Sequence, residues 1–195
     1  RVGDRMTSEM TFDLLLRGGQ VADGTGAEPY TADVAVTRGR IEAIGDLGHV
    51  VAARVIDVSG RLVLPGLVDA HVHAETVLER ADVQEAMLRQ GVTTVILGQD
   101  GLSFAPGSAA TVEYVARYFA AVAGRPPAAW RDGLDVDTLL RYFDRRTPLN
   151  VATLVPLANV RHDVLGPEEQ PAGDRLPAMV GLVEAGLEQG AVGVS

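Results

Sequence analysis

The sequence has 195 residues, enough to bury a full core, and its 47% hydrophobic and 22% charged residues are typical of a folded globular protein rather than a disordered one. A formal net charge of −9 disfavours binding to nucleic acid or to an anionic membrane, because the phosphates would be repelled, and no apolar run approaches the roughly 20 residues of a membrane span. The absence of cysteine excludes disulfides and thiolate ligands, so any metal ion here must be held by histidines and carboxylates.

The first third of the chain predicts a small all-β domain. Residues 1–11 are interpreted as a disordered or non-native tail, and because they contain no secretory segment we expect a cytoplasmic protein. Short strands separated by turn residues then predict a β-sandwich segment over residues 12–64, with a hairpin turn at Arg38-Gly39. The strands are expected at 12–16, 20–21, 33–37, 40–44 and 55–58.

His71 and His73 are the strongest candidate metal ligands in the sequence. They end an apolar run that is typical of a buried strand over residues 67–73, and alternation along a strand points both imidazoles to the same face. Two neutral imidazoles on one face supply half the coordination sphere of a metal such as zinc. The competing interpretation is a pair of surface histidines. Asp69 faces away from the pair by the same alternation, so we expect it to support the site rather than bind the metal.

Strands and helices alternate after Gly66. Repeated βα units form either an open doubly wound sheet or a closed eight-stranded barrel, and four units with a ligand pair on the first strand favour the barrel. We therefore predict an α/β fold in which residues 65–195 form the first half of a metal-dependent (β/α)8 TIM-like barrel. The expected partner is the remainder of that barrel, in the same chain or as a separate one. The strands are expected at 67–73, 92–97, 151–155 and 191–195, and the helices around 82–90, 112–122, 139–143 and 174–190.

Several motifs occur along the chain in an order that is typical of one enzyme family. They are Leu16-Arg17-Gly18-Gly19, Arg40 to Gly45, Pro65 to His73, Gln90 to Val95, Gly98 to Gly101 with Ala105-Pro106, and Gly190 to Ser195. With these motifs the chain resembles the amidohydrolase superfamily, and within it the N-acyl-D-amino-acid deacylase (D-aminoacylase) branch. The resemblance implies a small β-sandwich beside a distorted TIM barrel, with one or two Zn²⁺ ions at the carboxyl ends of the strands. It also implies hydrolysis of an N-acyl-D-amino acid to a carboxylate and a free D-amino acid.

The sequence departs from that family's pattern in two places. Members usually carry Gly-Asn-Cys-Gly, with a metal-binding cysteine, where this chain has Gly98-Gln99-Asp100-Gly101. A carboxylate is also a zinc ligand, so Asp100 is the third candidate ligand, and the alternative is a simple Asp-Gly turn. Members often have Gly-His after the third strand, where this chain has Pro156-Leu157. We do not expect His162 to take that role.

No catalytic residue is assigned within the chain. By resemblance, the general base and the remaining ligands lie on later strands, so we expect metal-activated water to hydrolyse an amide only when the rest of the barrel is present. Arg161 is a candidate for binding a substrate carboxylate, against the alternative of a surface arginine. Glu75 either touches the metal's surroundings or is a solvated loop acid. The alternative functions are hydrolysis of a cyclic amide or dipeptide on the same fold, or a non-catalytic, metal-poor relative.

Overall fold

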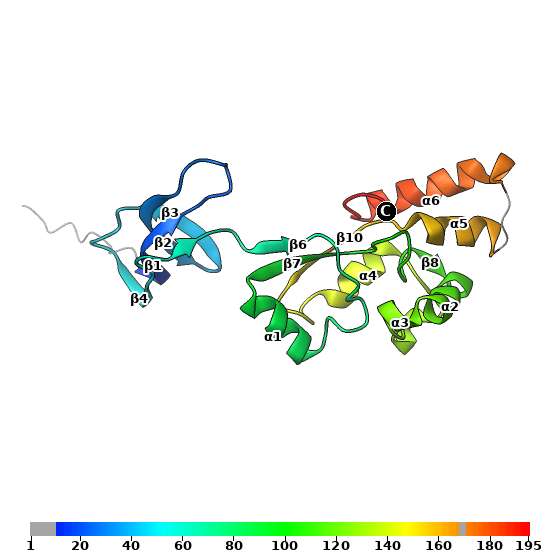
Figure 1. Ribbon diagram of the computed structural model, residues 1–195, viewed down its shortest axis with the longest axis horizontal. Helices are drawn as coiled ribbons and strands as arrows, with labels where there is room; N and C mark the ends of the chain where they lie inside the picture. Colours follow the sequence, from blue (N-terminus) through cyan, green and yellow to red (C-terminus); the bar gives the residue numbers. More distant parts are fainter. Residues whose placement is uncertain (1–10, 168–170) are drawn as a thin grey trace, which may run out of the picture. The chain divides into compact units, whose positions relative to one another are not determined.

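The computed structural model describes residues 11–167 and 171–195 and divides the chain into two compact units, Arg1–Pro65 and Gly66–Ser195 (Figure 1). The predicted tail over residues 1–11 lies outside the described residues except for Thr11, which begins the first strand. Among the described residues, no helix is both long and apolar enough to cross a membrane.

The N-terminal unit is built on one sheet with the strand order β3-β2-β1-β4, and β5 pairs with the end of β1 beyond β4. β1 pairs with β2 antiparallel and with β4 and β5 parallel, and β2 pairs with β3 antiparallel. A two-layer sandwich, as predicted, would need a second sheet from outside the described residues of this unit. The strands are β1 (Thr11–Val21), β2 (Tyr30–Thr37), β3 (Arg40–Gly45), β4 (Val51–Asp57) and β5 (Leu62–Val63).

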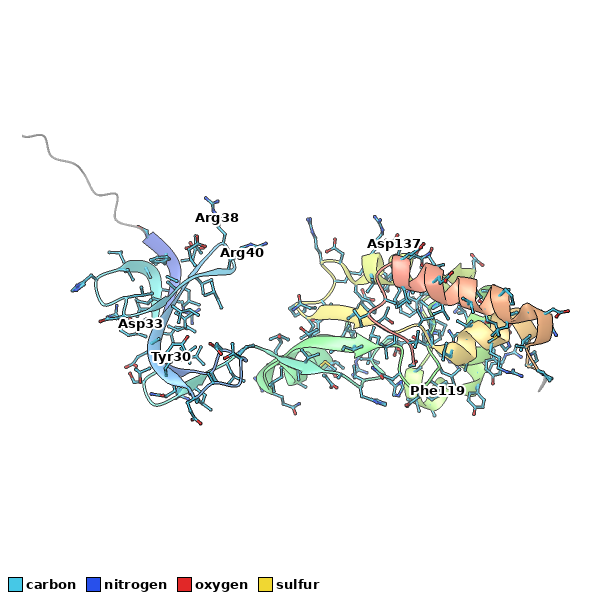
Figure 2. All side chains as sticks on the ribbon, turned by 90° about the horizontal axis from the view of Figure 1, so that it is seen from above. Tyr30, Asp33, Arg38, Arg40, Phe119 and Asp137 are labelled. Atoms are coloured by element: carbon cyan, nitrogen blue, oxygen red, sulfur yellow. The ribbon has the colours of Figure 1, made fainter. Side chains whose placement is uncertain are left out.

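The predicted hairpin at Arg38-Gly39 is confirmed. Both residues have positive φ, 51° and 73°, the conformation of a two-residue turn whose twist matches that of the flanking strands. Figure 2 shows Arg38 and Arg40 projecting at this turn. On the same sheet, the buried Asp33 accepts hydrogen bonds from the backbone N–H of Gly18 (2.7 Å) and of Leu47 (3.3 Å). Gly18 and Gly19 therefore form a bulge inside one long strand rather than a break between two strands.

The second unit contains a parallel sheet with the order β10-β7-β6, formed by β6 (Leu67–Asp69), β7 (Val92–Leu97) and β10 (Asn150–Thr153). The strand predicted over residues 67–73 is too long, because pairing ends at Asp69. The carboxylate of Asp69 accepts a hydrogen bond from the backbone N–H of His71 (3.2 Å), and this local turn competes with the sheet ladder. The strand predicted at 191–195 is reduced to an isolated parallel bridge between Val155 and Val194.

Helices follow the strands of this unit, and α5 and α6 pack side by side (Figure 1). Ser108 caps α2 and Asp135 caps α4 through their side chains. The helix predicted around 174–190 begins later than expected, because Asp174 lies in a 3-10 turn that precedes α6. The helices are α1 (Ala81–Arg89), α2 (Ala109–Tyr118), α3 (Ala120–Ala123), α4 (Val136–Phe143), α5 (Leu157–Leu165) and α6 (Leu176–Glu188), and β8 (Gly107–Ser108) pairs with β9 (Gly133–Leu134).

The barrel is not closed within the described residues. A core that includes Leu78, Val95, Leu97, Phe104 and Trp130 fills the space between the sheet and the helices. Apolar side chains remain exposed along β6, at Leu67 and Val68, and near the bridge on the far side of the sheet, at Val192 and Val194. The sheet therefore ends in two apolar margins.

Candidate metal centre

His71, His73 and Asp100 come together at one edge of the parallel sheet. The two histidines follow β6 and Asp100 follows β7, and these neighbouring parallel strands have their carboxyl ends at the same edge. The Oδ2 atom of Asp100 lies 3.3 Å from Nε2 of His71 and 3.1 Å from Nε2 of His73. The imidazole rings meet edge to face, with centroids 5.6 Å apart. The shortened strand has therefore not separated the predicted pair.

The spacing of these atoms suits a metal ion. One ligand atom from each residue lies within 4.8 Å of the other two. Ligands in a tetrahedral zinc site, with bonds of about 2.1 Å, are roughly 3.4 Å apart, so small side-chain rotations bring this set to that spacing. Two imidazoles and one carboxylate are also ligands that zinc accepts, and they leave a coordination position for another group.

The electrostatics of the centre keep the Asp100 carboxylate ionised. Its hydrogen bonds with His73 and then with His71 hold the pKa of Asp100 below its ordinary value. The side chain of His73 is 17% exposed, whereas that of His71 is 60% exposed and faces solvent. A charged acceptor therefore faces two ring nitrogens, and a divalent cation would take the place of the protons in these two hydrogen bonds.

The turn that carries Asp100 has an unusual backbone. Asp100 itself has φ of 56°, and it is flanked by Gly98 and Gly101 at 79° and 74°. The left-handed region is costly for most side chains but is tolerated by aspartate, whose short polar side chain bonds locally. A Cβ on Gly98 would lie 2.6 Å from the carbonyl oxygen of Leu154, so this position requires glycine on steric grounds as well. Asp100 is therefore both a turn residue and a member of the cluster.

Phe119 contacts the site from the boundary of α2 and α3. Its ring packs edge to face against His73, with centroids 5.1 Å apart. The helical spacing of Phe119 predicts core packing, and nothing in the sequence indicates a place beside the histidines. The Nδ1 atom of His73 is buried and has no hydrogen-bond partner among the described residues. An apolar ring thus covers the less exposed of the two histidines.

The other polar residues considered from the sequence take different positions. Arg161 and His162 lie on α5, a helix that the sequence did not predict, and both side chains are partly buried. The ring of His162 is 2.6 Å from the hydroxyl of Thr111 and stacks on Tyr114, so it serves the packing of α5 on α2. Glu75 is not a solvated loop acid, as one interpretation held, because it is only 2% exposed.

Residues 54–195 match the amidohydrolase family, which is nearly three quarters of the chain. The chain belongs to this family. Among curated relatives it is 36% identical to a D-aminoacylase of Alcaligenes xylosoxydans xylosoxydans, and 36% identical to an N-acyl-D-glutamate deacylase of the same organism. Each match covers 94% of this chain and 37% of the relative. The chain thus spans little more than a third of the length of these amidohydrolases.

Solved structures of the same family give the same result. An N-acyl-D-glutamate deacylase from Bordetella bronchiseptica, crystallised with zinc and a phosphonate inhibitor that mimics the tetrahedral intermediate, superposes with a TM-score of 0.77 at 34% identity. The match covers 95% of this chain and 38% of that one. A D-aminoacylase structure superposes with a TM-score of 0.74 at 32% identity. The described fold is therefore that of part of a D-aminoacylase-like amidohydrolase.

Proposed function

We propose that this chain forms part of a zinc-dependent hydrolase that deacylates an N-acyl-D-amino acid or a related small amide. The single observation that carries the proposal is the convergence of His71, His73 and Asp100 at the carboxyl edge of the sheet. Membership of the amidohydrolase family and the likeness to deacylases of N-acyl-D-amino acids support it. Zinc in the Bordetella structure supports the choice of metal.

In this proposal His71, His73 and Asp100 hold one metal ion, and a second ion is accommodated only with ligands from outside these residues. The bound metal supplies a polarised water and a Lewis acid for the amide carbonyl. The chain's own residues do the positioning. The two imidazoles and the carboxylate fix the location of the ion, and the Phe119 ring excludes water from the buried side of His73.

The remaining ligands and the general base are proposed to come from polypeptide that completes the barrel, in the same protein or in a separate chain. The exposed apolar margins at Val68 and Val194 support this, since an unpaired parallel sheet is normally covered by further strands and helices. Arg161 stays a prediction for binding the substrate carboxylate, now placed on α5.

The test is an activity and metal assay on the full native protein. Purified protein is analysed for zinc and incubated with N-acetyl-D-amino acids, their L-enantiomers, cyclic imides and dipeptides. Zinc at one or two ions per molecule together with preferential release of D-amino acids supports the proposal. Turnover of a cyclic imide or dipeptide alone would reassign the substrate, and less than one metal ion per molecule with no turnover would indicate a non-catalytic relative.

A further inference from the structure

Glu75 is a buried carboxyl group placed beside the candidate metal centre. It follows His73 by two residues and is 2% exposed. Its Oε1 atom accepts hydrogen bonds from the backbone N–H of Gly98 (3.2 Å) and from the hydroxyl of Ser103 (2.9 Å). Its Oε2 atom is buried without a hydrogen-bond partner among the described residues. Burying a carboxyl group disfavours folding unless hydrogen bonds compensate, so the burial of Glu75 beside the centre indicates a specific role.

The two partners of Glu75 lie on either side of Asp100. Gly98 begins the turn that carries Asp100, and Ser103 follows shortly after it. Ser103 is itself fixed, because its N–H donates to Asn159 Oδ1 (3.3 Å) and its carbonyl accepts from Asn159 Nδ2 (2.6 Å). One carboxyl oxygen on the histidine segment therefore sets the distance to the segment that carries the third ligand.

Gln99 makes the reciprocal connection. It lies on the turn, is 6% exposed, and its side-chain amide donates to the carbonyl of Ala70 (2.7 Å) and to that of Ile96 (2.9 Å). Ala70 immediately precedes His71. Gln99 thus links the turn to the residue before His71, and Glu75 links the segment that carries the histidines to the turn.

We propose that Glu75 and Gln99 are positioning residues that hold His71, His73 and Asp100 at the spacing a metal ion needs. The inference rests on the proposed metal centre and assigns a positioning role to Glu75 and Gln99, which are not themselves ligands. Neither histidine lies in a strand or helix, so their positions depend on such cross-links rather than on the sheet ladder. Loss of either cross-link widens the range of ligand spacings and weakens metal binding.

The experiment measures metal affinity and thermal stability separately in the full native protein. Zinc affinity is determined by competition with a chelator, and cobalt substitution reports the coordination geometry by its visible absorption. Glu75→Leu removes the acceptor, and Gln99→Met removes the donor at nearly constant volume. Each is expected to lower zinc affinity about 10- to 100-fold. Glu75→Gln keeps an oxygen that accepts from Gly98 and Ser103, and we expect it to restore affinity to within about threefold of the wild type.

Glu79→Leu is the matched control. Glu79 lies on the same segment and also accepts two hydrogen bonds, from the Tyr142 hydroxyl (2.6 Å) and from Arg146 (3.2 Å), but neither partner belongs to the centre. The control should lower the melting temperature and leave zinc affinity unchanged. If Glu75→Leu fails to fold, the zinc affinities of Gln99→Met and Glu75→Gln test the proposal in its place.

Two results would overturn the inference alone: zinc affinity in Gln99→Met and Glu75→Leu no weaker than in Glu79→Leu, or an affinity in Glu75→Gln as poor as in Glu75→Leu. A wild-type protein that binds no metal would overturn the proposed function, and this inference with it. The wild-type measurement therefore distinguishes the two failures.

Discussion

The hydroxyl of Tyr142 on α4 donates a 2.6 Å hydrogen bond to the carboxylate of Glu79, in the segment that leads from the histidines to α1. Arg146 completes the group, with its guanidinium 3.2 Å from Glu79 and 4.4 Å from the centroid of the Tyr142 ring. This bond ties a helix to a segment without regular structure. Its contribution to stability can be measured, because the single tryptophan, Trp130, lies in the core of the same unit and contacts Tyr142.

Tyr142→Phe is expected to lower the free energy of unfolding of the second unit by about 1 kcal/mol at neutral pH. The value lies below the roughly 1.5–3 kcal/mol typical of a bond to a charged group, because Glu79 is partly exposed. The measurement is urea unfolding followed by Trp130 fluorescence. Equal midpoints for the variant and the wild type would show that the bond contributes nothing.

The difference between Tyr142→Phe and the wild type should depend on pH. The hydrogen bond from Tyr142 and the neighbouring Arg146 hold the pKa of Glu79 below its ordinary value of 4.5. A depressed carboxyl pKa stabilises the folded state above pH 4.5, and this stabilisation is lost as pH falls through the folded pKa. The difference in unfolding free energy should therefore shrink below pH 4.5. A difference that stays constant down to pH 3 would contradict this origin.

Asp100→Ala should abolish high-affinity metal binding, with zinc affinity reduced more than about 100-fold, because the cluster loses its one charged ligand. Asp100→Asn keeps the shape of the side chain but not its charge, so its zinc affinity should lie between those of the wild type and Asp100→Ala. Zinc competition on the full native protein checks both variants. Asp69→Asn is the comparison: it also loses a charge but keeps the oxygen that accepts from the backbone N–H of His71, so it should change the affinity far less.

Gly98→Ala should destabilise the second unit by roughly 2–4 kcal/mol, since it combines a left-handed backbone with a clash against a carbonyl oxygen. Gly166→Ala separates the two effects. Gly166 has φ of 76° but open space around its Cβ position, so its variant should cost only about 1 kcal/mol. Thermal unfolding followed at Trp130 measures both. Similar losses in the two variants would show that the contact with Leu154 is relieved by a small shift.

Asp135→Ala should destabilise the same unit by about 1 kcal/mol, because Asp135 caps α4 by accepting from the backbone N–H of Thr138 (2.8 Å). Hydrogen bonds from Thr138, first from its side chain and then from its backbone, hold the pKa of Asp135 below its ordinary value. The capping contribution is therefore present above that ordinary value and is lost as pH falls through the lowered pKa of the folded state. Asp137→Ala, two residues on, removes a surface ion pair with Arg141 and an acidic side chain from the first turn, but no capping hydrogen bond, and should cost less (Figure 2). Equal losses would argue against the cap.

The sequence predicted those features that depend on local pattern. The β-branched run at 92–97 became β7 at the same bounds, and the two histidines and Asp100 were foreseen as a group. The prediction of the first strand was wrong beyond Asp69, because a single side-chain bond to His71 outweighs an apolar run when ending a strand. Helix α5 was missed because it follows Pro156 directly and has weak amphipathic periodicity.

Features that depend on tertiary contacts could not be read from the sequence. For Glu75 the sequence left two interpretations open, a place beside the metal or a solvated loop acid, because its burial depends on Gly98 and Ser103, which are distant in sequence. Phe119 has the spacing of a core residue, and its contact with His73 depends on where α2 meets α3. Contacts of this kind depend on how the chain packs, whereas candidate metal ligands can be recognised in a sequence by their residue type.

The two segments that carry His71, His73 and Asp100 come from adjacent strands and hold each other through their own hydrogen bonds. The three candidate ligands are therefore brought together by two neighbouring βα units of the described chain. Under the proposed function, a strand that pairs with the exposed edge would find these three side chains already close together. In the proposed metal centre, metal binding would therefore not require the barrel to be complete, and the two events would be separable.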